Sequence, residues 1–337
     1  MTSYSLPAPA GLPDGFGTRP ATRDDVAALL RLIRGDQRSA TGEATLGEDE
    51  ITAWFDSARA RDRADMLIVL RGGEPVGLWR VVRNFDDVYW VSVAADRSLP
   101  GAELDAVWTA GLDWLQRASL AIAAHVGVRQ PRADVWVDER DPLAARHAEA
   151  AGFERVRAFF EMHLDLAGYT PPAPTRDVTI RPAVIAGADS PDLRAMYEVI
   201  TESFRDHFDF HLRSFEDWSD SRLQDPLAAR DRWFLAELGG ELVGGLISHN
   251  AFVASADADY VANLGVLRSG RGRGVAKALL HAAFARAQAD GRAAVRLHVD
   301  AESPTGATRL YESVGMYRRV VGYDHHKRLG GDPTANG

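Results

Sequence analysis

The clearest pattern of apolar and polar positions lies in the stretch that follows Gly272. Apolar residues recur there at the spacing of one helical face, which predicts an amphipathic helix over residues 272–289 with one buried side. The residues on that side are Ala276, Leu280, Ala283, Phe284 and Ala287. Apolar runs flanking a Gly-Gly turn precede this helix, and they predict strands joined in a β-hairpin.

The same patterning predicts alternating helices and strands through the whole C-terminal half. Strands are expected over residues 177–182, 232–238, 241–250, 258–267 and 293–299, with a final strand pair over 316–328. Helices are expected over residues 190–203, 213–224, 272–289 and 304–314. This order favours an α+β domain with a mixed sheet.

The chain also repeats itself once, at offsets of 162 to 167 residues. Three local matches occur in the same order in both halves. They are Thr18-Arg19-Pro20-Ala21 with Ile180-Arg181-Pro182-Ala183, Gly72-Gly73-Glu74 with Gly239-Gly240-Glu241, and Val135-Trp136-Val137-Asp138 with Leu297-His298-Val299-Asp300. Because the matches join elements of the same type, they indicate two copies of one domain.

A proline-rich stretch marks the joint between the copies, because proline stiffens a chain and cannot donate to a sheet ladder. It contains Pro171, Pro172 and Pro174. We therefore predict an N-terminal domain over residues 1–167, a linker over 168–176, a C-terminal domain over 177–330 and a mobile tail over 331–337.

Composition narrows the class of protein. The 337 residues include no cysteine, so disulfides, a thiol nucleophile and thiolate metal sites are excluded. The net charge of −9 disfavours binding to nucleic acid. No apolar run reaches the roughly 18–20 residues of a membrane span, and the first 20 residues do not resemble a secretion signal. We expect a cytoplasmic protein without a membrane partner, either a monomer or a homodimer.

The sharpest chemical signal is a loop of glycines and arginines over residues 268–274, between a strand ending in Leu264-Gly265-Val266-Leu267 and a helix. Glycines let backbone N–H groups approach a phosphate, and a helix N-terminus attracts anions. Arg271 and Arg273 can add charge-assisted hydrogen bonds. The sequence lacks the Gly-Lys-Ser/Thr of a P-loop and the spacing of a dinucleotide fingerprint. We therefore expect a diphosphate here; a tight turn with solvated arginines is the alternative.

Two motifs carry a resemblance to a known family. Arg271-x-x-Gly274-x-Ala276 after a strand resembles the coenzyme A loop of the GNAT superfamily of acyl-CoA-dependent N-acyltransferases. Leu310-Tyr311 before Gly315-Met316 is similar to the second signature of that family. The resemblance implies two tandem copies of the GNAT fold, each a mixed, mostly antiparallel sheet flanked by helices. Tandem copies resemble mycothiol synthase and related two-copy acetyltransferases.

The resemblance also implies roles for individual residues. Tyr311 would protonate the departing thiolate of acetyl-CoA. Backbone groups of the strand would pair with the pantetheine arm of the coenzyme, and amides of the loop would bind its diphosphate. The strand residues are Leu264, Gly265, Val266 and Leu267; the loop residues are Arg271, Gly272, Arg273, Gly274, Val275 and Ala276. Ser303 stands where many members have an asparagine near the coenzyme.

The base that deprotonates the acceptor is less obvious, because the strand before the loop has no glutamate where many relatives have one. Asp259, His249 or a water chain could serve. An acceptor pocket is expected around four residues, Glu202, Asp206, His207 and His211. Such a cluster could also suggest a metal, but acyl transfer by this scheme needs none, so no metal site is expected.

The first copy lacks both signatures. Its loop has one glycine, a proline at Pro100 and acids at Asp96 and Glu103, while Ala148 stands where the second copy has Tyr311. We therefore expect acetyl-CoA to bind only the second copy. The predicted function is transfer of an acetyl group to a primary amine of a small molecule. A non-catalytic acyl-CoA sensor or scaffold and an enzyme acting on a protein amine are the alternatives.

Overall fold

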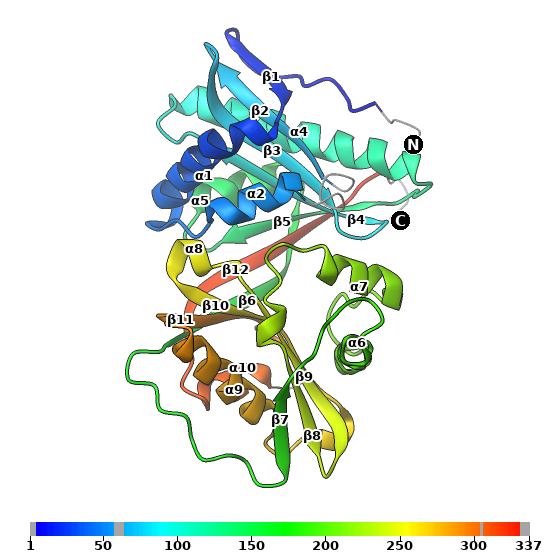
Figure 1. Ribbon diagram of the computed structural model, residues 1–337. Helices are drawn as coiled ribbons and strands as arrows, with labels where there is room; N and C mark the ends of the chain where they lie inside the picture. The colour runs from blue at the N-terminus through cyan, green and yellow to red at the C-terminus, as the bar shows by residue number, and fades with distance from the viewer. Residues whose placement is uncertain (1–4, 57–63, 304–305, 331–337) are drawn as a thin grey trace. The chain divides into compact units, whose positions relative to one another are not determined.

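The computed structural model describes residues 5–56, 64–303 and 306–330. The predicted tail over residues 331–337 lies outside this part of the chain. Contacts divide the protein into two compact units. Unit 1 contains residues 1–158 and 321–337, and unit 2 contains residues 159–320. The order of elements is drawn in Figure 1.

Unit 1 is an antiparallel meander of four strands followed by a long helix and a parallel strand. Strands β1 to β4 pair in sequence, β5 joins β4 in parallel, and residues 322–328 of β12 pair antiparallel with β5. The strands are β1 (Phe16–Pro20), β2 (Ala64–Arg71), β3 (Glu74–Arg83), β4 (Val88–Ala95), β5 (Arg132–Asp138) and β12 (Tyr317–Arg328). The helices are α1 (Val26–Thr41), α2 (Glu48–Asp56), α4 (Gly101–His125) and α5 (Pro142–Ala150).

Unit 2 repeats the same plan. Its strands follow the order β7, β8, β9, β10, β11, and residues 159–165 of β6 complete the sheet beside β11. The strands are β6 (Glu154–Asp165), β7 (Val178–Pro182), β8 (Phe234–Leu238), β9 (Glu241–His249), β10 (Ala258–Val266) and β11 (Ala294–Asp300). The helices are α6 (Pro191–Phe204), α7 (Phe215–Leu223), α8 (Val253–Ala256), α9 (Val275–Ala289) and α10 (Ala307–Glu312). Helices α9 and α10 cover one face of this sheet, while α6 and α7 cover the other (Figure 1).

The two units exchange their last strands. Most of β6, which ends the first copy in sequence, pairs in the sheet of unit 2, while the end of β12 pairs in the sheet of unit 1. The compact units therefore differ from the linear halves 1–167 and 177–330 at one strand each. The final strand pair expected over 316–328 is also corrected, because that stretch forms the single strand β12.

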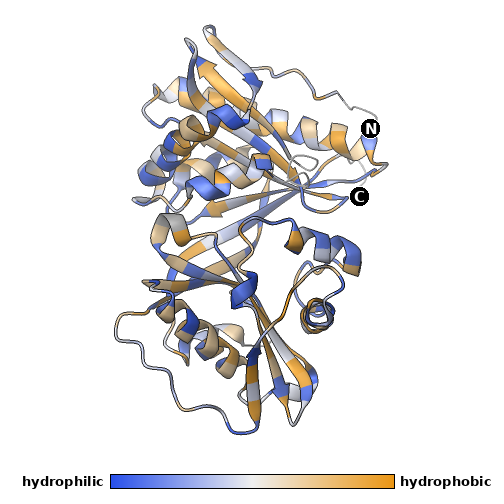
Figure 2. Cartoon of the chain, viewed as in Figure 1, coloured by the Kyte–Doolittle hydropathy of each residue, from blue (hydrophilic) through white to orange (hydrophobic). Residues whose placement is uncertain are grey.

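Each sheet carries its own apolar core, and apolar residues are concentrated on the strands (Figure 2). In unit 1 the core lies between the sheet and α4, where Trp79 and Trp114 are fully buried with ring centroids 6.0 Å apart. In unit 2 the stripe predicted after Gly272 is confirmed, since Leu280, Ala283 and Phe284 of α9 are buried against the sheet. Burial of an apolar side chain of this size stabilises the fold by about 1.5–3 kcal/mol.

The repeated Arg-Pro-Ala motif has a structural role in both units. Arg19 at the end of β1 binds both oxygens of Asp25, at 2.6 and 2.8 Å. Arg181 at the end of β7 binds both oxygens of Asp192 in the same way, at 2.7 and 2.9 Å. Each carboxylate also accepts a backbone N–H of the connecting turn. The motif therefore fixes the first helix of each unit against its first strand.

Candidate active site

The sheet of unit 2 splits between strands β10 and β11. Strand β10 pairs in parallel with β11 at only three positions, from Ala258 opposite Ala294 to Tyr260 opposite Arg296. Beyond Tyr260, β10 continues to Val266 beside β9, and β11 continues beside β6. Within the described residues, the backbone edge of β10 over 261–266 thus has no strand partner on the side of the split. Such an edge can pair with an extended ligand.

A β-bulge marks the start of this split. The register between β10 and β9 shifts between Val261 and Asn263, so one extra residue is accommodated in β10. The bulge turns Asn263 toward α7, where its side-chain oxygen accepts a hydrogen bond of 2.9 Å from Arg222. Bulges often redirect side chains beside active sites.

The glycine-arginine loop lies at the end of β10 and leads into α9. Gly272 and Gly274 have positive φ angles of 73° and 81°, a conformation that favours glycine. The first helical hydrogen bond runs from the Ala278 N–H to the Gly274 carbonyl. Among the described residues, the backbone amides from 272 to 277 have no acceptor. The first turn of α9 contains no acid. Six free amides at a helix N-terminus form a cradle for an anion.

Glycines allow both helix layers to approach the strands beside this cradle. A Cβ atom at Gly265 would lie 3.0 Å from the side chain of Ser203 on α6. One at Gly244, on the neighbouring strand, would lie 2.9 Å from Val275 at the start of α9. The linker also reaches the cradle, because a Cβ at Gly274 would lie 3.1 Å from Thr175. Side chains at these positions would push the helices away from the split.

Tyr311 lies on α10 and is 8% exposed. Its ring packs in the apolar core of unit 2, and burial raises the pKa of the phenol to about 12. The hydroxyl has no hydrogen-bond partner among the described residues. The phenol therefore stays protonated at neutral pH and keeps its proton available for a leaving group.

The structure places Asp259 away from the split. Its side chain is 1% exposed and lies on the same face of β10 as Val261, 3.2 Å from the buried guanidinium of Arg232. Burial raises the pKa of Asp259 to about 6, an effect opposed by Arg232. A carboxylate enclosed in this way can support the strand, but it cannot reach an acceptor.

His249 has both ring nitrogens occupied. Its Nε2 lies 2.9 Å from the Asp225 carboxylate, and its Nδ1 accepts the backbone N–H of Ala251 at 3.0 Å. The residue lies at the end of β9, directly opposite Tyr260. The structure therefore assigns His249 to holding the turn between β9 and β10, and we no longer expect it to act as the base.

The four residues expected around the acceptor do not converge on one point. Glu202 is exposed and pairs with Arg205, and Asp206 is exposed and pairs with Arg268 at the start of the loop. His211 lies 3.3 Å from Asp209. Burial lowers the pKa of His207; Asp300 opposes this shift and Arg271 of the loop adds to it.

Ser303 lies between β11 and α10. Its backbone N–H donates to the Asp300 carbonyl at 3.1 Å, which turns the chain just past the end of β11. The coenzyme-side role expected for Ser303 from the sequence stays a prediction.

A polar cluster at the split was missed in the sequence. Tyr260 lies opposite Arg296, so it shares a face with Arg296 and with His298 two residues on. The Tyr260 hydroxyl lies 3.1 Å from Nδ1 of His298. Glu161 of β6 lies opposite His298, with its carboxylate 4.0 Å from Nε2. The signal was present in the repeat, where His298 replaces Trp136 of the first copy.

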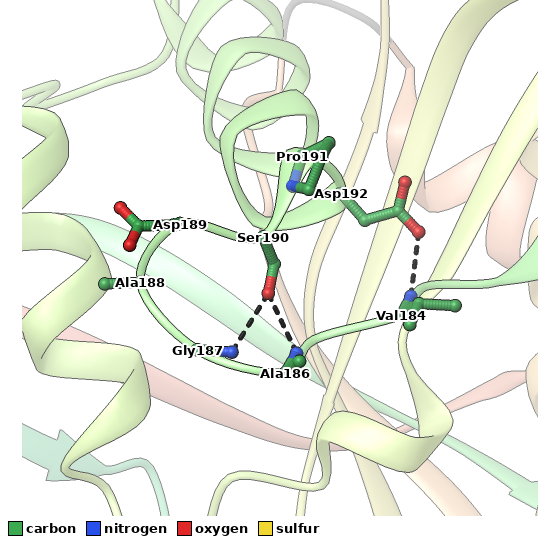
Figure 3. Close-up of a pocket in the computed structure, with 8 residues that line it drawn as sticks. All are labelled: Val184, Ala186, Gly187, Ala188, Asp189, Ser190, Pro191 and Asp192. Carbon is green, nitrogen blue, oxygen red and sulfur yellow. Dashed lines mark hydrogen bonds between the residues drawn. The ribbon is translucent and has the colours of Figure 1, made fainter.

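The surface hollow in Figure 3 is unrelated to this split. All eight of its lining residues come from the single stretch 184–192 before α6. The Ser190 hydroxyl accepts the N–H groups of Ala186 and Gly187, and the Asp192 carboxylate accepts that of Val184 (Figure 3). The polar groups thus close the loop on itself and leave little for a ligand.

Comparisons with known proteins agree with this geometry. Residues 193–316 match the model of the acetyltransferase (GNAT) family. A mycothiol acetyltransferase of Thermobispora bispora is 28% identical over 88% of this chain and 97% of its own length. One of Acidothermus cellulolyticus is 32% identical over 64% of this chain and 66% of its own length.

Solved structures show the same architecture. A GCN5-related N-acetyltransferase from Sphaerobacter thermophilus is 26% identical with a TM-score of 0.73, and the match covers 94% of this chain and 96% of that one. A tandem GNAT protein from the clavulanic acid biosynthesis pathway has the same fold, with a TM-score of 0.69 at 17% identity over 94% of this chain and 99% of that one.

The chain therefore belongs to the GNAT superfamily of acyl-CoA-dependent transferases. The fold class predicted from the repeat, two tandem GNAT copies, is confirmed. The reaction is transfer of an acetyl group from acetyl-CoA, the donor that GNAT acetyltransferases use. Within the described residues, no helix has the length and apolar character to cross a membrane.

Proposed function

We propose that unit 2 transfers an acetyl group from acetyl-CoA to the primary amine of a small molecule. The observation that carries this proposal is the open edge of β10 leading into six free amides over residues 272–277. The pantetheine arm would pair with that edge, and the diphosphate would accept hydrogen bonds from the amides. Arg271 and Arg273 are exposed beside them and would add positive charge.

The chemistry is direct transfer without a covalent enzyme intermediate. The amine nitrogen attacks the thioester carbonyl, the C–N bond forms and the C–S bond breaks. Sulfur takes the proton of the Tyr311 hydroxyl, and the nitrogen gives up one proton to a base. Solvent then restores both groups. Most of the rate would come from aligning the two substrates and stabilising charge at the carbonyl.

Two observations favour a small acceptor. The relatives over most of this chain are mycothiol acetyltransferases, which act on a small molecule by name. The acceptor-side residues at the split include tyrosine, histidine and arginine side chains that are partly or fully buried, which suits a compact polar ligand better than an extended peptide. Assays should therefore begin with the acceptor of mycothiol acetyltransferases and a panel of small amines.

The first test replaces Tyr311 by phenylalanine. The variant should lower kcat by 10²-fold or more, because the thiolate loses its proton donor, while acetyl-CoA affinity stays within threefold. Release of the coenzyme A thiol measures turnover, and the protein adds no thiol signal of its own because the chain has no cysteine. Unchanged turnover would exclude the acid role of Tyr311. Absence of binding heat with acetyl-CoA would reject the proposal as a whole.

A further inference from the structure

Acetyl transfer needs a base, and both candidates chosen from the sequence are engaged elsewhere. Asp259 is enclosed with Arg232, and His249 is bound through both nitrogens. The acceptor-side face at the split must therefore supply another proton acceptor, if the proposed function holds.

Three side chains on three adjacent strands lie close together where β10 and β11 diverge. Tyr260 stands at the last paired position of β10, and His298 follows the split on β11, with Nδ1 3.1 Å from the Tyr260 hydroxyl. Glu161 stands on β6 opposite His298 and is buried. The His298 side chain is 30% exposed, whereas the Glu161 side chain behind it is 7% exposed.

The carboxylate behind His298 is itself held in place. Arg319 of β12 binds Glu161 at 3.1 Å, and Arg296 of β11 approaches it at 3.7 Å. These contacts hold the Glu161 carboxylate in place, and it faces Nε2 of His298 at 4.0 Å. A buried carboxylate beside an imidazole stabilises the positive charge that forms when the ring takes a proton.

We propose that His298 is the base of the reaction and takes the amine proton through the Tyr260 hydroxyl. In the tautomer with its proton on Nε2, His298 accepts the Tyr260 O–H at Nδ1. As the C–N bond forms, the amine proton passes to the Tyr260 oxygen and the original phenol proton passes to Nδ1. Glu161 then faces the Nε2–H of the imidazolium. Solvent later removes the proton from the ring.

The electrostatics of the cluster suit this role. Burial lowers the pKa of His298 below its usual 6.5; Glu161 opposes this shift and Arg296 adds to it. His298 is therefore neutral and able to accept a proton at pH 7. Burial raises the pKa of Tyr260, with further contributions from Glu161 and Tyr311, so the phenol relays a proton without ionising first.

The decisive variant is His298→Asn, whose amide oxygen can accept the Tyr260 O–H but cannot take up a proton. We expect kcat to fall at least 100-fold at pH 7. In the wild type, kcat at saturating acceptor should rise with pH through a pKa below 6.5 and then level off. In the variant that plateau should disappear, and kcat should keep rising with pH. Tyr260→Phe should lower kcat comparably.

His163→Asn is the matched control. His163 lies on the same face of the sheet, on β6, and is equally bound to a carboxylate, with Nε2 3.1 Å from Asp165. It is two residues removed from Glu161 along the strand, so its replacement should leave kcat within twofold and the pH profile unchanged. Equal acetyl-CoA affinity in the wild type and in the His298→Asn, Tyr260→Phe and His163→Asn variants would show that the variants are folded.

The outcomes separate the two proposals. If the wild type releases no thiol with any amine, the proposed function itself fails. The base assignment is overturned if the wild type is active and His298→Asn keeps both its kcat within threefold and the same fall of kcat at low pH. The base assignment is also overturned if kcat of His298→Asn is reduced but still falls at low pH as in the wild type, because that pattern indicates a structural role only.

Discussion

The two units share one plan but treat the same point of the sheet in opposite ways. In unit 1, β4 pairs with β5 at only three positions, as β10 does with β11 in unit 2. In unit 1, however, an ion-pair cluster joins the segments that follow β4 and β5, the two strands on either side of the split. Arg97, which follows β4, donates to Asp36 of α1 at 2.6 Å and binds both oxygens of Asp141 at 3.0 and 2.5 Å. All three side chains are about 12% exposed.

The loops after the split differ as well. Pro100 precedes α4 and its carbonyl accepts the N–H groups of Glu103 and Leu104, so the first turn of α4 has engaged amides and an acid. In unit 2 the N–H of Lys277, which corresponds to that of Glu103, has no acceptor among the described residues. The same strand pairing thus produces a split in both units, whereas the residues that follow the split differ; we expect these residues to decide which unit binds a coenzyme.

The residues of the proposed proton relay differ in the same way. Counting along the paired strands, Trp90 of β4 and Trp136 of β5 stand where unit 2 has Tyr260 and His298. Trp90 is 54% exposed and Trp136 is 47% exposed, and neither indole can act as a base. Unit 1 thus lacks the cradle, the phenol of Tyr311 and the relay together.

The largest expected effect comes from giving unit 2 the acid of unit 1. Ala276→Glu places a carboxylate in the first turn of α9, as Glu103 stands in the first turn of α4. Repulsion of the diphosphate should raise the dissociation constant of acetyl-CoA at least 100-fold, about 2.7 kcal/mol. Ala285→Glu, in the middle of the same helix, should change it less than threefold. Calorimetric titration with acetyl-CoA measures both dissociation constants. Equal affinities of the two variants would contradict the proposed difference between the first turns of α9 and α4.

An effect of comparable size, on stability and not on coenzyme affinity, is expected from removing Arg97 in unit 1. Arg97→Met leaves Asp36 and Asp141 without their shared cation in a buried site, which should lower the free energy of unfolding by about 3 kcal/mol. Arg140→Met is the control, because the partners of Arg140, Asp138 and Glu43, are more exposed and its loss should cost about 1 kcal/mol. Urea titration measures both, while acetyl-CoA affinity should stay unchanged in each.

The smallest effect concerns the motif that the units share. The Arg19 guanidinium lowers the pKa of Asp25 from 3.8 to about 2. A depressed carboxyl pKa contributes stability above pH 3.8, and this contribution is lost as the pH falls through 2. Asp25→Asn should therefore lower the free energy of unfolding by about 1 kcal/mol at pH 7, after allowance for solvent screening, and by almost nothing at pH 2. A constant difference across this range would contradict the assignment.

Much of the fold could be predicted because its signals are local. The glycine-arginine loop, the stripe of α9 and the paired hairpins each lie within about 20 residues, and the duplication doubled the evidence for the domain. Strand exchange could not be predicted in the same way. Strands β6 and β12 are equivalent in the repeat, so either copy offers each of them the same kind of partner.

The base was harder to locate because side chains on a strand alternate between faces. Asp259 and Tyr260 are neighbours in sequence, yet one faces the core and the other faces the split. Only the pairing register reveals which is which. Glu161 is more remote still, because its strand belongs to the first half of the sequence.

The exchanged strands give a reason why the first copy, in which we expect no coenzyme site, has been retained. The sheet of unit 2 ends in residues that the first half encodes, and that segment also supplies Glu161. A gene shortened to the second half alone would lose part of the sheet that we propose holds the active site. Selection on the proposed catalytic copy would therefore also preserve the first copy, because a strand of the first half completes the sheet of unit 2.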